Sequence, residues 1–216
     1  MSKEELLETL SKYSVMPVIT IESVDSAVPM ADAMIEGGLP VAEITFRTEA
    51  AVDVMARLKK ERPDMILGAG TILSVGNLRR AKEAGAWFGV APGFNPEVVK
   101  EAQKLDMLFI PGIVTPSEVE QAMALGCNVL KFFPAEASGG MAMINCLAAP
   151  YGHTGVKFMP TGGINMENVE TYLASDIVWV VGGTWIAKKD VIAAGDWDTI
   201  RNNCRETMKM VKRVRG

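Results

Sequence analysis

The stretch VAEITFRTEAAVDVMARLKKERPDMILGAGTI, residues 41–72, has the pattern of one strand–helix–strand unit. Two short apolar runs, Val41–Phe46 and Met65–Ala69, have the length and composition of strands, and Glu49–Lys60 between them has apolar residues at helical spacing. Antiparallel strands can be joined by a two-residue turn, whereas parallel strands need a long crossover connection, usually a helix. A helix between two strands therefore indicates that the strands are parallel. The stretch therefore predicts a parallel α/β fold.

The same alternation continues through the chain. Strands are expected at Val15–Ile21, Val41–Phe46, Met65–Ala69, Trp87–Val90, Met107–Ile110, Val129–Phe132, Val156–Met159 and Ile177–Val181. Helices are expected at about Ser26–Glu36, Glu49–Lys60, Val75–Ala84, Pro96–Lys104, Pro116–Leu125, Gly140–Ala148, Met166–Ala174 and Trp197–Val214, with an extra one at the start of the chain. Eight such units without a Pro- or Ser-rich linker favour one domain over residues 1–216, a (β/α)8 TIM barrel with an extra N-terminal helix. A doubly wound open sheet is the alternative, but it requires no particular number of strands.

The composition excludes several classes of function. A net charge of −4 and the lack of a basic stripe argue against nucleic-acid binding. No apolar run reaches the ~18 residues of a membrane helix, and the charged N-terminus lacks a signal-peptide core. Cys127, Cys146 and Cys204 form no motif, which indicates reduced thiols in a cytoplasmic protein. With His153 as the one histidine, no zinc site is expected.

Side chains alternate between the two faces of a strand, and this brings three polar residues of the second strand together. Glu43, Thr45 and Arg47 share one face, whereas the residues between them are apolar and should meet the helices. The polar set is therefore expected inside the barrel, where opposite charges are costly unless they are paired or used. The alternative is a structural Glu43–Arg47 ion pair at an exposed strand end.

The stretch VLKFFPAE places Lys131 between apolar neighbours. If Leu130 and Phe132 pack under helices, Lys131 points inward near the carboxyl end of its strand. It then shares one cavity with Glu43 and Arg47. The alternative is a lysine that extends along its aliphatic stem to the surface.

These three charges indicate a particular chemistry. A partly desolvated amine beside a cation is more readily neutral, and a neutral amine attacks a ketone to form an imine. Glu43 can move the protons of this reaction, and Arg47 can hold a carboxylate by a bidentate contact. The set therefore predicts an α-keto acid substrate. Lys157, a second strand lysine, lies at the amino end of its strand and is interpreted as structural.

Two glycine turns, PTGGIN and VGGTW, follow the last two strands. Barrel enzymes often bind phosphate at these two loops through backbone amides. Glycine pairs also serve tight turns without any ligand, which is the alternative. The binding residues expected here are Thr161, Gly162, Gly163, Gly182, Gly183 and Thr184.

These motifs resemble those of a known family. The segments PVI, AVPMADAM, EITFRTE, GAGTIL, APGFNPEVV, IPGIVTPSE, KFFPAE, PTGGIN and GGTW extend from about Pro17 to about Asp198. They are similar to motifs of the class I 2-keto-3-deoxy-6-phosphogluconate (KDPG) aldolases, which share a family with 4-hydroxy-2-oxoglutarate (KHG) aldolase.

The resemblance implies a (β/α)8 barrel that assembles as a homotrimer and uses no metal or cofactor. It implies cleavage of KDPG to pyruvate and glyceraldehyde 3-phosphate, and possible cleavage of KHG to pyruvate and glyoxylate. By the same resemblance, Lys131 forms the Schiff base and Glu43 carries protons. The remaining implied roles are a hold on the pyruvyl carboxylate by Arg47 and Thr71 and a pocket wall made by Pro92 and Phe133.

The sequence departs from the family pattern in two places. The first strand, PVITIES, lacks an arginine that some related aldolases carry there, and Thr184 stands where many members have serine. A relative that acts on the galactonate isomer tends to carry NS in place of RTE, so the gluconate substrate is favoured.

Two other functions remain open on the sequence alone. A barrel-type phosphosugar isomerase would use the phosphate loops but has no need of Lys131. A non-catalytic phosphosugar-binding protein gains little from a buried amine. His153 has no assigned role.

Overall fold

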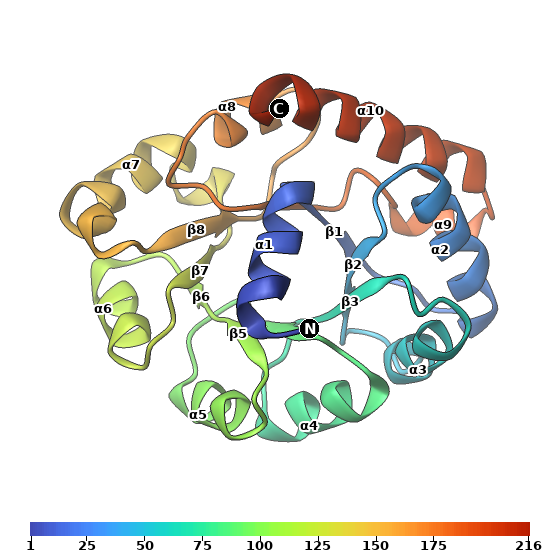
Figure 1. Cartoon of the computed structure of the whole chain (residues 1–216), viewed down its shortest axis with the longest axis horizontal. Coiled ribbons are helices and arrows are strands. Elements are labelled where there is room, and N and C mark those ends of the chain that lie inside the picture. Colours follow the sequence, from blue (N-terminus) through green and yellow to red (C-terminus); the bar gives the residue numbers. More distant parts are fainter.

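Parallel strands and helices alternate along the whole chain in the computed structural model, which describes residues 1–216 (Figure 1). The strands are β1 (Val15–Ile19), β2 (Val41–Thr45), β3 (Ile66–Gly70), β4 (Phe88–Val90), β5 (Leu108–Ile110), β6 (Gly112–Ile113), β7 (Val129–Phe132), β8 (Lys157–Pro160) and β9 (Val181–Gly183). The α-helices are α1 (Lys3–Tyr13), α2 (Ala27–Glu36), α3 (Ala51–Glu61), α4 (Val75–Ala84), α5 (Pro96–Lys104), α6 (Pro116–Ala124), α7 (Gly140–Tyr151), α8 (Val169–Leu173), α9 (Lys189–Ala193) and α10 (Trp197–Arg215).

The sequence pattern predicted most of these elements, and the position of the eighth strand needs correction. The eighth strand was expected at Ile177–Val181, but the ladder forms at β9, which begins at Val181. The run Val178–Val180 is apolar because it is buried, not because it pairs in a continuous ladder. The fifth strand, expected at Met107–Ile110, is present as β5; the short strand β6, which follows Pro111 with its missing N–H, was not predicted. Helix α9 was not predicted.

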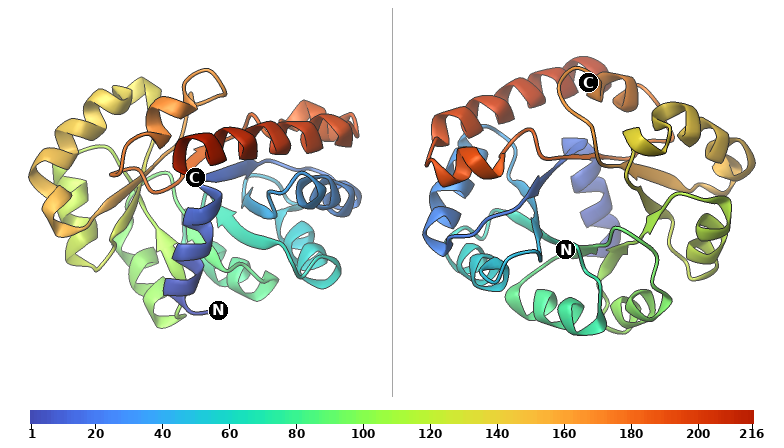
Figure 2. Two further views of the ribbon diagram at one scale, coloured as in Figure 1. Left: turned by 45° about the horizontal axis from the view of Figure 1, so that its top comes forward. Right: turned by 180° about the vertical axis from the view of Figure 1, so that it is seen from behind.

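The strands form two parallel sheets, one in the order β5-β4-β3-β2-β1-β9 and one in the order β6-β7-β8. Isolated parallel bridges, Phe158 with Val178 and Thr161 with Gly182, connect the region of β8 to that of β9. Figure 1 and the reverse view in Figure 2 show the helices arranged around the strands. The parallel α/β class is therefore confirmed, whereas the ladder itself is not one continuous eight-stranded sheet.

Helix α1 covers the amino ends of the strands. It begins with a capping box between Ser2 and Glu5, and its apolar face buries Leu6 and Leu10. These leucines belong to an inner cluster with strand residues such as Met16. Burial of each leucine contributes about 1.5–3 kcal/mol. In Figure 1, α1 lies across the centre of the molecule, so this end is closed.

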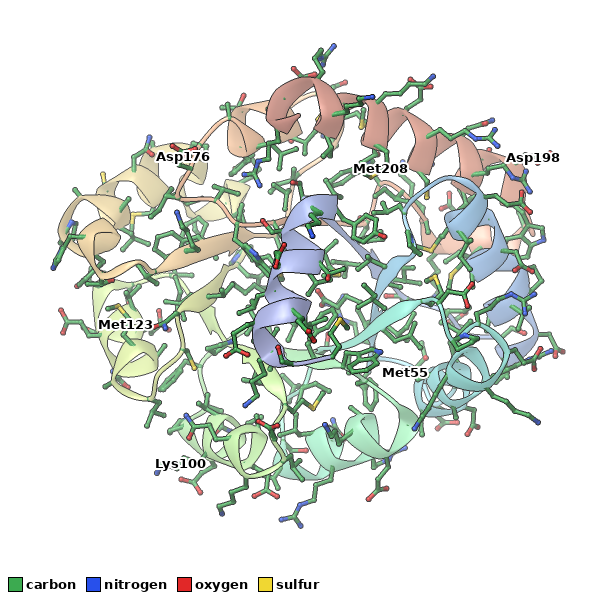
Figure 3. All side chains as sticks on the ribbon, in the orientation of Figure 1. Met55, Lys100, Met123, Asp176, Asp198 and Met208 are labelled. Carbon is green, nitrogen blue, oxygen red and sulfur yellow. The ribbon has the colours of Figure 1, made fainter.

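The other, larger core lies between the strands and the surrounding helices and contains residues such as Ile44 and Leu130. Figure 3 shows side chains filling the space around the strands, while Lys100 and Asp198 lie at the outer rim. No helix combines the length and the apolar character needed to cross a membrane.

Candidate active site

Glu43 on β2 and Lys131 on β7 form a buried ion pair between two strands that are far apart in the sequence. The Nζ atom of Lys131 lies 3.4 Å from Oε1 of Glu43. Lys131 is 3% exposed and Glu43 is 1% exposed, so Lys131 does not extend to the surface. The strand parity explains the placement, because Leu130 belongs to the outer core while Val129 packs against the inner cluster.

The glutamate carboxylate fits because the neighbouring strand β3 carries glycine beside it. A Cβ atom on Gly70 would lie 2.2 Å from Oε1 of Glu43, closer than a real contact allows. Gly68, which is paired in register with Glu43, likewise leaves room for the ring of Phe88. The GAG segment of β3 therefore shapes the space in which the carboxylate lies.

Two buried polar atoms at this site have no hydrogen-bond partner within the protein. They are Oε2 of Glu43 and Oγ1 of Thr161. A buried polar atom without a partner costs about 1–3 kcal/mol, so fold stability alone does not favour two of them in one site. Thr161 lies against Gly182, where a Cβ atom would be 2.2 Å from Oγ1. Both atoms are suited to hydrogen bonds with a bound molecule.

Arg47 and Thr71 are in direct contact. Nε of Arg47 donates to Oγ1 of Thr71 at 2.9 Å. Thr71 has φ of 58°, a left-handed conformation that costs a β-branched residue about 1–3 kcal/mol. Arg47 is exposed and forms no salt bridge, so the alternative of a Glu43–Arg47 pair is wrong. The outer N–H groups of Arg47 are free to bind a carboxylate.

Of the two predicted wall residues, Phe133 directly follows the lysine strand β7, and Pro92 packs against its neighbour β6. The ring centroid of Phe133 is 5.3 Å from Nζ of Lys131, within the range of a cation–π contact. Pro92 packs against Gly112, where a Cβ atom would lie 2.2 Å from the proline carbonyl oxygen. Gly112 is paired in register with Lys131, so Pro92 is separated from the lysine by one strand.

The two glycine turns lie side by side, joined by the Thr161–Gly182 bridge. Gly162 and Gly163 have φ of +103° and +78°, which glycine adopts without strain. The N–H groups of Gly162, Gly163 and Thr184 donate to no backbone carbonyl. Thr184 is exposed.

Gly183 has a structural reason of its own, because a Cβ atom there would lie 1.7 Å from the ring of Trp185. Packing alone accounts for this glycine. Gly183 therefore has a structural explanation that requires no ligand.

Lys157 lies nearer the closed end of the molecule than Lys131 does. It is paired in register with Val129, and its Nζ donates to the carbonyl of Asp176 at 2.8 Å. This contact agrees with a structural role. His153 is exposed in a short 3₁₀ turn, Gly152–Thr154.

No group of three or more His, Cys, Asp or Glu side chains is placed to hold a metal ion. The buried cysteines are poor nucleophiles, because burial raises the pKa of Cys127 to about 11 and that of Cys204 to about 12.

Sequence reasoning missed two polar contacts at this end of the strands. Oγ1 of Thr20 lies 2.9 Å from Oγ1 of Thr45, which donates to the carbonyl of Ile19 at 3.0 Å. The hydroxyl of Tyr172 donates to the carboxylate of Glu136. The strand parity could have suggested the first contact, but no local pattern predicts the second.

Comparison with known proteins identifies the family. The sequence model described as "Aldolase: KDPG and KHG aldolase" matches residues 6–203. The chain is 41% identical to the 2-dehydro-3-deoxy-phosphogluconate aldolase of Haemophilus influenzae over 209 residues, which are 97% of this chain and 98% of that protein. It is 42% identical to the KHG/KDPG aldolase of Escherichia coli K12 over 211 residues, 98% of this chain and 97% of that protein.

Among solved structures, the KDPG aldolase of Legionella pneumophila superposes with a TM-score of 0.89 at 36% identity, covering 93% of this chain and 97% of that chain. That structure holds pyruvate captured at low pH as a covalent carbinolamine intermediate. The chain belongs to the KDPG and KHG aldolase family.

Proposed function

We propose that this protein is a class I aldolase that cleaves KDPG to pyruvate and glyceraldehyde 3-phosphate through an imine on Lys131. KHG is a second substrate, cleaved to pyruvate and glyoxylate. The observation that carries the proposal is the buried Glu43–Lys131 pair, which places an amine and a proton carrier 3.4 Å apart.

We place this chemistry in one closed (β/α)8 barrel domain spanning residues 1–216. The two bridges between the regions of β8 and β9, and the position of α1 over the amino ends of the strands, support closure. By family resemblance the protein assembles as a homotrimer in the cytoplasm. Its partners are small keto acids, not nucleic acids or membranes.

In the first half of the reaction, Glu43 takes a proton from Lys131, and the neutral amine attacks the C2 ketone. The carbinolamine then receives a proton from Glu43, loses water and becomes the protonated imine. Arg47 holds the C1 carboxylate by a bidentate contact, and Thr71 orients the guanidinium. The hydrogen bond from Arg47 to Thr71 supports this arrangement.

In the second half, Glu43 removes the proton of the C4 hydroxyl. The C3–C4 bond breaks, its electron pair moves to the imine nitrogen, and the aldehyde leaves. The enamine that remains takes a proton at C3 from Glu43. One water molecule, which balances the one released earlier, hydrolyses the protonated imine and returns pyruvate and the ammonium form of Lys131.

The far end of the substrate lies at the glycine turns. The N–H groups of Gly162, Gly163 and Thr184 are not used by the backbone, and amides of this kind favour a phosphate dianion. The hydroxyl of Thr184 adds one donor, and Oγ1 of Thr161, which has no partner in the protein, adds a further polar atom at the turns. The RTE segment supports the gluconate rather than the galactonate isomer.

The isomerase and the non-catalytic binding protein fit the site less well. Neither needs a lysine amine that is 3% exposed and paired with a carboxylate. Family membership also favours the aldolase.

Borohydride reduction in the presence of pyruvate tests the proposal. One reduced pyruvyl group should be added per chain, and peptide mapping should find it on Lys131. Lys157 is the internal control, since it lies in a strand but donates to a carbonyl. Incorporation at Lys157, or none at all, would contradict an imine mechanism at Lys131.

A further inference from the structure

The turn that contains Gly162 and Gly163 is fixed to the loop that follows the lysine strand β7. The N–H of Ala135 donates to the carbonyl of Thr161 at 2.8 Å, and the N–H of Glu136 donates to the carbonyl of Gly162 at 3.0 Å. In a trans peptide group the C=O and N–H point in opposite directions. Holding these two carbonyls therefore directs the N–H groups of Gly162 and Gly163 to the opposite side.

Backbone and side-chain atoms of the same loop pack closely against the turn. A Cβ atom on Gly163 would lie 2.6 Å from Cβ of Glu136, and one on Gly162 would lie 3.3 Å from Cα of Pro134. Because there is no free space between them, a displacement of Glu136 is transmitted to the glycines.

Glu136 is itself held by Tyr172 of α8. The phenol donates to Oε1 of Glu136, and Tyr172 is 2% exposed. Burial first, and then the neighbouring Glu136 carboxylate, raises the pKa of Tyr172, so the phenol keeps its proton at neutral pH. A Cβ atom on Gly140 would be 3.1 Å from the phenol oxygen, so α7 also closes around this contact.

We propose that Tyr172 and Glu136 are positioning residues that hold the Gly162–Gly163 turn in its phosphate-binding conformation. This inference rests on the proposed function, which places the substrate phosphate at that turn. Neither residue touches the reacting atoms. The phenol acts in two ways: it fixes the loop, and it keeps a carboxylate from turning toward a bound dianion, which like charge would repel.

Tyr172→Phe removes the hydroxyl and keeps the ring. KM for KDPG should rise about three- to tenfold, a fraction of the effect of losing a direct hydrogen bond to a charged group. The value of kcat, the kinetics with KHG and the borohydride labelling of Lys131 should not change. Tyr151→Phe is the matched control, because Tyr151 donates to Glu120 at 2.8 Å between α7 and α6. It should leave all four measurements unchanged.

Adding Glu136→Gln to Tyr172→Phe removes the negative charge and should lower KM for KDPG part of the way back to the wild-type value. If Tyr172→Phe raises KM equally for KDPG and KHG, or raises neither, the positioning role is overturned. If Tyr172→Phe does not fold, the KM values for KDPG and KHG are compared in Glu136→Ala instead, since Glu136 is exposed. Failure of the wild-type protein to label at Lys131 would reject the proposed function. Normal wild-type labelling and cleavage, with Tyr172→Phe unchanged, would reject only the positioning role.

Discussion

The ammonium group of Lys131 lies 3.4 Å from the carboxylate of Glu43, although the two residues are 88 positions apart in the sequence. Both are almost completely buried, and the second carboxylate oxygen has no partner in the protein. The pair thus combines an amine, a proton acceptor and an unused hydrogen-bonding atom in one place.

Replacement of Glu43 by glutamine should slow the reaction without removing the lysine. Turnover is expected to fall by about 10²–10⁴, the usual contribution of a positioned acid–base group. Steady-state cleavage of KDPG measures the loss, and pyruvate labelling of Lys131 should still occur, more slowly. Full turnover in Glu43→Gln would exclude Glu43 from proton transfer.

Removing only the lysine charge should destabilise the fold. Lys131→Met leaves Glu43 buried without a counter-charge, at a cost of about 3–5 kcal/mol in the free energy of unfolding. The double variant Lys131→Met with Glu43→Gln should recover much of this, as measured by urea denaturation. If the single and double variants are equally stable, the pair contributes no coupling.

Gly70→Ala should displace the Glu43 carboxylate, because the added Cβ would lie 2.2 Å from Oε1. Activity should fall well below that of the wild type. Gly76→Ala is the control, since its Cβ would meet nothing closer than 3.8 Å and it lies in helix α4. That control should keep full activity and gain up to about 1 kcal/mol of stability. Normal activity in Gly70→Ala would show that Glu43 can act from another position.

Thr184→Val should separate the phosphorylated substrate from the short one. Loss of one hydrogen bond to a charged group costs about 1.5–3 kcal/mol, or roughly a ten- to hundredfold loss in kcat/KM for KDPG. KHG is too short to reach Thr184, so its cleavage should hardly change. Equal losses for both substrates would assign Thr184 to the fold and remove VGGTW from the phosphate site.

Dialysis against a strong chelator should not change the rate of KDPG cleavage. The imine supplies the electron sink, and the residues contain no cluster suited to a metal ion. The rate is measured before dialysis, after it, and after a divalent ion is added. A loss that the ion restores would contradict the prediction.

Strand parity predicted the meeting of Glu43 and Lys131, but it also placed Arg47 inside the barrel with them, whereas Arg47 is exposed and contacts Thr71. It placed Glu43 and Lys131 on inward faces, since period-two alternation needs only the local sequence. It did not predict the left-handed Thr71, whose φ of 58° is imposed by its surroundings and not by its residue type. The contact between Tyr172 and Glu136 joins a short helix to a loop, and no periodicity encodes such a pairing.

The ends of the ladder were the least predictable part of the fold. Val178–Val180 has the composition of a strand because it is buried, and buried composition does not reveal which residues pair. The break between β5 and β6 at Pro111 follows from the missing N–H, which the sequence shows but whose effect depends on the neighbouring strand.

Helix α1 closes the amino ends of the strands, so substrates and products share a single mouth. In the proposed mechanism the pyruvyl half is still bonded to Lys131 when the aldehyde is released, so the aldehyde departs first. In the synthetic direction the same bond requires pyruvate to arrive first, because the enamine must form before it can attack the aldehyde. A helix without a catalytic residue thereby confines arrival and departure to the opposite end of the strands.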